Sequence, residues 1–184
     1  MFKKGILLAL LIGVISLANA GDNAREISEE SVGFIGIEVG GALIQGDTTG
    51  TIFGEVNHKG KGVSFGVKLG AQNEQWKSSV IIDYFNSDDD DQMYERAMIQ
   101  VDYFIAPTMF ATSAFRPYIG INGGYLNYES TAINENGITY GGDIGFNVGV
   151  SDSVDLDLTY RYSIAGPHEF DNIHNVVVGI NYLY

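Results

Sequence analysis

The feature that most constrains this chain is a strict two-residue alternation of apolar and polar side chains. In SVDLDLTYRYS (153–163), an apolar residue occupies every second position from Val154 to Tyr162, and polar or charged residues occupy the positions between them. This spacing predicts a β-strand with one apolar and one polar face. The fold therefore depends on which face meets a core and which meets the surroundings of the protein.

Seven further segments after residue 32 show the same alternation, and turn-rich stretches separate them. Helical periodicity is absent from this part of the sequence, and the 24 glycines and 11 tyrosines of the chain suit strands and turns better than helices. We therefore expect an all-β fold whose strands cover residues 33–44, 62–71, 75–86, 93–106, 116–127, 137–150, 153–163 and 173–184.

The two faces of these strands differ in a way that identifies the inside. Apart from Glu95 at a strand end, the apolar rows carry no charge, whereas the opposite rows mix charged residues with many glycines. Glycine is unusual on a water-facing strand because it weakens the strand and packs against nothing. The narrow interior of an eight-stranded barrel, by contrast, is filled by a few large side chains among small ones. We predict an eight-stranded antiparallel up-and-down transmembrane β-barrel, with the polar rows inside and the apolar rows toward lipid.

The aromatic residues support a lipid-facing exterior. If the N-terminus is periplasmic, they fall into a periplasmic group (Trp76, Tyr103, Tyr182, Tyr184) and an outer group (Tyr84, Tyr125, Tyr140, Tyr160, Tyr162). Two such belts are typical of barrels embedded in lipid. The connections follow the same logic, with tight periplasmic turns at 72–74 and 151–152 and longer outer loops, although the periplasmic connection 107–115 is longer than this rule predicts.

The first twenty residues have the pattern of a secretory signal peptide. Lys3 and Lys4 precede the apolar run GILLALLIGVISLA (5–18), and Ala18-Asn19-Ala20 gives a small-x-small cleavage pattern. The alternative is an uncleaved membrane anchor, which the shortness of the run disfavours. We expect cleavage after Ala20, a short periplasmic segment at 21–32 and a single barrel domain at 33–184.

Composition excludes some classes of function. Without Lys3 and Lys4 the chain carries 8 basic residues against 23 acidic ones, and binding to nucleic acid needs a basic surface. There is no cysteine, so no disulfide stabilises the fold. No later apolar run is long enough for a transmembrane helix, so a membrane-spanning form has to be a closed barrel.

Three stretches resemble a known family. FRPYIGINGGY (115–125) resembles the Pro-Tyr-glycine strand of small outer-membrane β-barrel proteins of the OmpA-like membrane-domain class. VDLDLTYRYS (154–163) resembles the penultimate strand of that class, and VVVGINYLY (176–184) resembles its closing strand. The resemblance implies an eight-stranded barrel of the bacterial outer membrane and an assembly signal at Tyr182 and Tyr184 that the barrel assembly machinery reads. It implies no single activity.

The residues around Ser163 argue against an enzyme. Outer-membrane lipid A deacylases of this architecture carry a His-x-Ser pair, but here Arg161 stands two positions before Ser163. A serine without a base within hydrogen-bond reach is not activated. His168 and His174 follow at other spacings, so we expect no catalytic residue.

An acidic run is the only candidate for a metal site. NSDDDDQ (86–92) has four carboxylates but lacks the alternating ligands and the turn glycine of a calcium loop. We expect a solvated acidic loop, with no metal site and no cofactor. The alternative is that divalent cations link these carboxylates to lipopolysaccharide phosphates.

The inward charges form the candidate functional site. We predict that the interior is lined by Glu38, Lys68, Arg96, Asp102, Asp143, Asp157 and Arg161, with Lys77, Asp83 and Asp155 on the same rows. These residues form either a neutralising network that plugs the barrel or a narrow, gated, charge-lined pathway. We favour the plug, because eight strands leave little free interior.

The functional hypotheses follow from this choice. The first is an integral outer-membrane protein with a structural role in envelope integrity and surface contacts through its extracellular loops. The longest of these, 45–61, contains Ile52, Phe53 and Val56, which either extend a hairpin above the membrane or belong to an ordinary mobile loop. The alternative is a small-solute porin, and the least favoured hypothesis is a lipid A-modifying enzyme. The expected partners are outer-membrane lipid, lipopolysaccharide and the assembly machinery, while any external ligand stays open.

Overall fold

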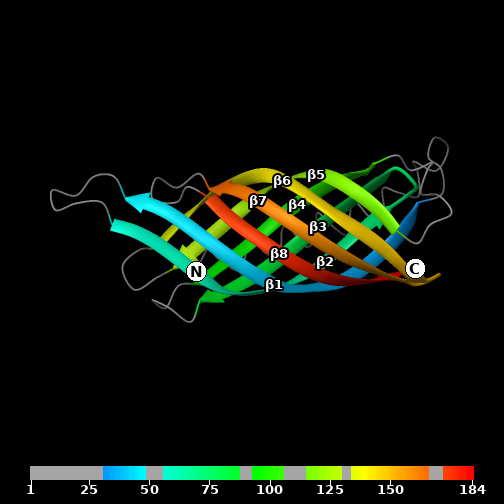
Figure 1. Ribbon diagram of the computed structural model, residues 1–184, viewed down its shortest axis with the longest axis horizontal. Helices are drawn as coiled ribbons and strands as arrows, with labels where there is room; N and C mark the ends of the chain where they lie inside the picture. Colours follow the sequence, from blue (N-terminus) through cyan, green and yellow to red (C-terminus); the bar gives the residue numbers. More distant parts are fainter. Residues whose placement is uncertain (1–30, 49–55, 88–92, 106–114, 130–133, 166–171) are drawn as a thin grey trace, which may run out of the picture. The chain divides into compact units, whose positions relative to one another are not determined.

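The chain forms a closed barrel of eight antiparallel strands. The computed structural model describes residues 31–48, 56–87, 93–105, 115–129, 134–165 and 172–184. Each strand pairs with its sequence neighbours, and β8 pairs with β1 to close the wall (Figure 1). The predicted all-β, eight-stranded, up-and-down fold is therefore confirmed. The strands are β1 (Val32–Thr48), β2 (Val56–Gln72), β3 (Trp76–Ser87), β4 (Met93–Phe104), β5 (Phe115–Glu129), β6 (Asn134–Ser151), β7 (Val154–Ala165) and β8 (Asn172–Leu183).

The strand ends differ from the predicted ones mainly at two hairpins. β1 and β2 pair as far as Thr48 and Val56, and β5 and β6 pair as far as Glu129 and Asn134. The alternation of side chains fades before these ends, but the backbone hydrogen bonds of a ladder do not depend on it. The predicted extension of the first hairpin is thus confirmed through Val56, while Ile52 and Phe53 lie outside the described residues.

The two ends of the barrel are distinguished by their connections. At the turn end, β2 and β3 are joined by a tight turn in which Asn73 Oδ1 accepts hydrogen bonds from the backbone N–H groups of Gln75 and Trp76. A second tight turn at residues 152–153 joins β6 to β7 at the same end. At the opposite end, called the loop end here, β1 ends at Thr48. The predicted tight turns are both present.

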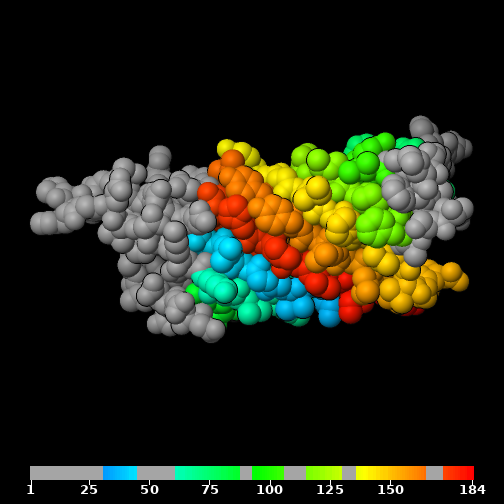
Figure 2. Space-filling view, viewed as in Figure 1, coloured from blue at the N-terminus to red at the C-terminus, as the bar shows by residue number. Residues whose placement is uncertain are grey.

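The orientation of the two strand faces is also confirmed. Outward residues such as Ile35, Val63 and Ile121 are 55%, 62% and 69% exposed, whereas the residues of opposite parity are buried. Figure 2 shows this outer wall, with β8 (red) between β7 (orange) and β1 (blue). Within the described residues there is no helix that is both long and apolar enough to cross a membrane.

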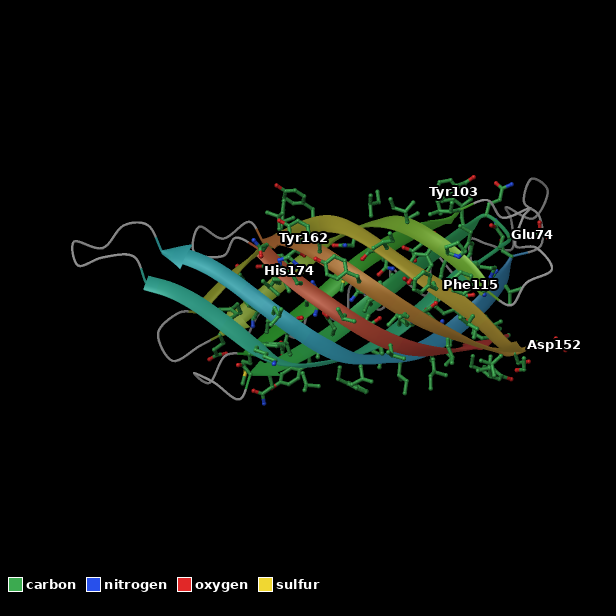
Figure 3. The ribbon with its side chains drawn as sticks, viewed as in Figure 1. Glu74, Tyr103, Phe115, Asp152, Tyr162 and His174 are labelled. Atoms are coloured by element: carbon green, nitrogen blue, oxygen red, sulfur yellow. The ribbon has the colours of Figure 1, made fainter. Side chains whose placement is uncertain are left out.

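Aromatic side chains gather on the outside at both ends. At the turn end, the Trp76 and Tyr103 rings lie 4.8 Å apart between centroids. Phe115 and Phe146, which the sequence analysis did not include, add a second pair at 5.0 Å. At the loop end, Tyr162 and His174 lie side by side with ring centroids 5.0 Å apart (Figure 3). The predicted sorting of aromatic residues into two groups is present.

Candidate functional site

The barrel interior holds all seven charged residues that the sequence analysis singled out. They come from five strands, and none is more than 5% exposed: Glu38 on β1, Lys68 on β2, Arg96 and Asp102 on β4, Asp143 on β6, and Asp157 and Arg161 on β7. Five of them form one connected group of ion pairs. Arg96 and Asp102 have other partners.

The Asp157 carboxylate is the most heavily bonded group of the interior. Its Oδ2 accepts hydrogen bonds from Lys68 Nζ at 2.6 Å and Lys77 Nζ at 2.5 Å. The amide Nδ2 of Asn181 donates to the same oxygen at 2.7 Å, and that of Asn147 donates to Oδ1 at 2.9 Å. One buried carboxylate therefore pairs with two ammonium groups and has both of its oxygens satisfied.

Arg161 connects carboxylates from two other strands. Its Nη1 donates to Glu38 Oε1 at 2.9 Å, and its Nε lies 3.3 Å from Asp143 Oδ1. Its Nη2 donates to the side-chain oxygen of Gln100 at 2.8 Å. Lys68 lies 4.0 Å from Glu38 and so joins this group to the group around Asp157. The planar guanidinium thus spans two carboxylates, which an ammonium cannot do with the same geometry.

Arg96 pairs with a residue outside the predicted seven. Its Nε and Nη2 donate to the two oxygens of Asp83 at 3.0 and 2.6 Å, which is a bidentate pair. The remaining nitrogen approaches Ser163 Oγ at 3.4 Å. The guanidinium also lies 5.3 Å from the centre of the Tyr94 ring. The Arg96–Asp83 ion pair extends the charged layer of the interior toward the loop end.

Asp102 differs from the other interior carboxylates. It is fully buried, and its two oxygens accept hydrogen bonds from Gln100 Nε2 at 3.0 and 2.9 Å. No Lys or Arg nitrogen among the described residues lies within 4.0 Å of it. It fits only because Gly120 faces it, since a Cβ at that position would lie 2.1 Å from Asp102 Oδ1.

One interior cation escaped the sequence analysis. Arg116 on β5 donates to Asn147 Oδ1, lies 3.6 Å from Asp155 Oδ2 and covers the Phe104 ring at 4.5 Å. Its parity with Gly120 and Gly124 was the available signal. The described interior then contains five cations (Lys68, Lys77, Arg96, Arg116, Arg161) against six carboxylates (Glu38, Asp83, Asp102, Asp143, Asp155, Asp157).

The interior is apolar toward the loop end, which the polar-inside rule did not predict. A packed cluster of side chains from five strands lies there: Ala42, Ile44, Phe85, Tyr94, Leu126, Tyr128 and Ile173. The Phe85 and Tyr94 rings stack at 4.9 Å. None of the seven is more than 3% exposed. The charged layer therefore lies beneath an apolar layer rather than continuing as a polar row.

The residues considered for catalysis lie on opposite sides of the wall. Ser163 is inside, fully buried, and its hydroxyl donates to Asn122 Oδ1 at 3.0 Å. His174 points outward from β8, and its Nδ1 bonds to the Tyr160 hydroxyl at 2.7 Å. His168 lies outside the described residues. The described part of the chain therefore brings no histidine base to Ser163.

No metal site is formed by the residues that the structure describes. They contain no group of three or more His, Cys, Asp or Glu side chains that could hold an ion. Of the acidic run 86–92, Asn86 and Ser87 belong to the end of β3, and 88–92 lie outside the described residues.

Comparison with known proteins supports the fold. Comparisons with protein-family models and with curated proteins found no match. Among solved structures, Neisserial surface protein A aligns with 85% of this chain and 100% of its own at a TM-score of 0.65 and 16% identity. The attachment invasion locus protein Ail of Yersinia pestis aligns with 83% of this chain and 99% of its own (TM-score 0.42, 12% identity). The outer membrane enzyme PagL aligns with 78% and 98% (TM-score 0.43, 10% identity). The chain thus has the closed-barrel fold of Neisserial surface protein A.

Proposed function

We propose that the chain is an integral outer-membrane protein whose closed barrel has a structural role in the cell envelope. The exterior supports this placement. Ile37, Val39 and Val178 are each about half exposed, and they belong to an apolar surface that surrounds the barrel. A water-soluble barrel would turn such rows inward, because large contiguous apolar patches are rare on soluble monomers. In lipid, a closed barrel also satisfies every backbone polar group of its strands.

The observation that carries the structural role is the packing of the interior. A water-filled channel would leave its lining exposed to water, yet Arg161, Asp157 and Glu38 are at most 3% exposed. Arg161 pairs with Glu38 and Asp157 pairs with Lys68, and the apolar cluster around Phe85 and Tyr94 lies beyond these pairs. Pores of this class keep a hydrated path between charged rings. A plugged interior instead favours a protein that acts through its outer surface and loops.

The proposal includes the route of the chain to the membrane. In this proposal the signal peptide directs export and is cleaved after Ala20, and the barrel assembly machinery then inserts the mature chain. Tyr182 and Tyr184 are 56% and 67% exposed at the turn end of the closing pair of strands. The backbone N–H of Tyr184 donates to Gly33 O, which holds Tyr184 beside the start of β1. This is where a terminal aromatic signal has to be presented. The OmpA-like family assignment belongs to the same proposal.

Conductance measurements test the closed interior. The purified barrel is inserted into planar bilayers, and the current is compared with that of the same lipid without protein. We expect no steps above background. Resolved steps whose ion selectivity changes in an Arg161→Ala variant would instead support the small-solute porin. Analysis of lipid A after expression tests the remaining alternative, a lipid A-modifying enzyme, and we expect lipid A to stay unchanged.

A further inference from the structure

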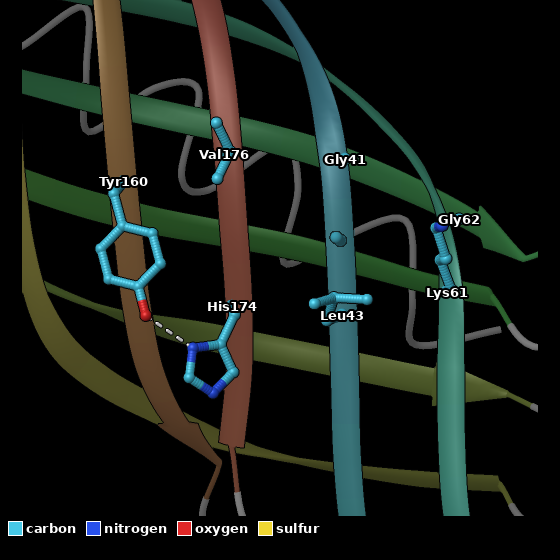
Figure 4. Close-up of a pocket in the computed structure, with 8 residues that line it drawn as sticks. Gly41, Leu43, Lys61, Gly62, Tyr160, His174 and Val176 are labelled. Atoms are coloured by element: carbon cyan, nitrogen blue, oxygen red, sulfur yellow. Dashed lines mark hydrogen bonds between the residues drawn. The ribbon is translucent and has the colours of Figure 1, made fainter.

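The outside of the barrel has a hollow near the loop end. It measures about 440 Å³ and crosses four neighbouring strands, β2, β1, β8 and β7. Gly41 forms its floor, and nothing lies within 4 Å of the position that a Cβ would take there. Figure 4 shows the lining side chains of Leu43, Val176, His174 and Tyr160 around this glycine.

Strand register places the outward lining residues in two rows across the strands, each completed by one flanking residue outside the lining, Tyr162 or Val63. The row nearer the loop end consists of Lys61, Leu43, His174 and Tyr162, which are direct cross-strand partners. The row below it consists of Val63, Gly41, Val176 and Tyr160. The upper row thus carries the cation and the imidazole, and the lower row is apolar except for the Tyr160 hydroxyl. The missing side chain at Gly41 turns this apolar row into a groove.

The polar groups of the upper row are available to a ligand. Among the described residues, no carboxylate lies within 4.0 Å of Lys61 Nζ. The Tyr160 hydroxyl bonds to His174 Nδ1 and fixes the imidazole, whose Nε2 has no hydrogen-bond partner among the described residues. In the structure, the other cations of the strands whose side chains are described point inward. Among the Lys and Arg residues of the strands whose side chains are described, Lys61 is therefore the exception, because it lies on the outer face.

We propose that this hollow binds a phosphorylated lipid of the outer leaflet. The inference rests on the proposed function, because the loop end must face outward for the rows to match the lipid. The phosphate then lies at the level of Lys61 and His174, where an ammonium and a ring N–H donate to its oxygens. An acyl chain runs from that level toward the turn end of the barrel. It passes over Gly41 and between the side chains of Leu43 and Val176. The order of the rows matches the order of groups in such a lipid.

A second copy of the chain fits the hollow less well. Two-fold association through this face would bring the Lys61 ammonium groups of both copies toward each other, since a two-fold interface uses the same patch twice. The hollow places the exposed Lys61 ammonium where an anion can reach it. Charge complementarity therefore favours a lipid phosphate.

Native mass spectrometry of the folded, detergent-purified barrel tests the proposal. The probes are bisphosphorylated lipid A and the same lipid after removal of its phosphates. We expect the wild-type barrel to form one adduct with the phosphorylated probe. The affinity should be lower by about tenfold or more for the dephosphorylated probe, and also for a Lys61→Gln variant with the phosphorylated probe, because a charge-assisted contact is lost in each case. Gly41→Leu fills the groove and should abolish the adduct.

Gly123→Leu is the matched control. Gly123 is another outward glycine, on β5 away from the hollow, with only one atom, at 3.8 Å, near its Cβ position. This variant should bind as the wild type does. Equal binding by Gly41→Leu and the wild type, equal binding of both probes, or a dimer in place of the adduct would overturn the lipid site. Failure of the proposed function would appear separately, as a chain that does not fractionate with membranes.

Discussion

Asp157 and Asp102 are both buried carboxylates, but their replacement by asparagine should affect the stability of the barrel very differently. In Asp157→Asn the ammonium groups of Lys68 and Lys77 lose the carboxylate that lies within 2.6 Å of both. The amide can keep only one acceptor oxygen, while four donors surround the carboxylate. In Asp102→Asn the only donor among the described residues is Gln100, and one oxygen suffices to accept its hydrogen bond.

The expected magnitudes follow from this difference. Removing one partner of a buried ion pair costs about 3–5 kcal/mol, because it leaves an uncompensated charge. Asp157→Asn leaves two ammonium groups with weaker partners, so we expect at least the lower value. Asp102→Asn removes a buried charge that has no cation of the described residues within ion-pair distance, so we expect a loss of about 1 kcal/mol or less, or a gain in stability.

Urea unfolding of the refolded barrel in detergent measures both effects. Trp76 is the single tryptophan of the chain and reports unfolding through its fluorescence. With a slope of about 1–3 kcal/mol per molar urea, Asp157→Asn should lower the midpoint by about 1 M or more. The reasoning is refuted if Asp157→Asn unfolds at the wild-type urea concentration, or if Asp102→Asn is the more damaging change.

Three further outcomes are expected. Gly120→Ala should destabilise the barrel by about 1–3 kcal/mol in the same urea assay, because its Cβ would overlap Asp102 and the backbone of β4; an unchanged midpoint would contradict the packing described for Asp102. Deletion of Tyr184 should reduce the amount inserted in cells and leave refolding in detergent largely intact, and equal insertion would remove the assembly role. Intact-mass measurement of the membrane fraction should give a chain that begins at Gly21, whereas a chain that retains Lys3 and Lys4 would contradict export by a cleaved signal.

The fold could be predicted because the alternation of apolar and polar residues assigns each side chain to one face of its strand. A two-residue period places Val154, Leu156 and Leu158 on one side of a strand whatever its neighbours are. The glycines between the charges then identified the inner side. Strand ends were less predictable, since the pairing of Thr48 with Val56 depends on backbone hydrogen bonds rather than on side-chain type.

The interior was predictable as a set of residues but not as a set of contacts. Asp157 takes its ammonium partners from positions 80 and 89 residues away. Such pairs depend on the stagger of all the intervening strands, which alternation does not encode. The apolar cluster around Phe85 and Tyr94 was missed for a different reason. Its residues have inward parity, so their place inside the barrel could have been predicted. They were missed because the inward rows were interpreted as polar along their whole length.

We expect the apolar wall to meet lipid, and one fluorescence measurement tests this placement most directly. A Trp76→Phe, Val178→Trp variant moves the single tryptophan to the middle of β8, at an outward position that is 50% exposed. In vesicles we expect short-wavelength emission that brominated acyl chains quench strongly and aqueous iodide does not. Emission that iodide quenches and brominated lipid leaves unchanged would show that this wall does not face the membrane.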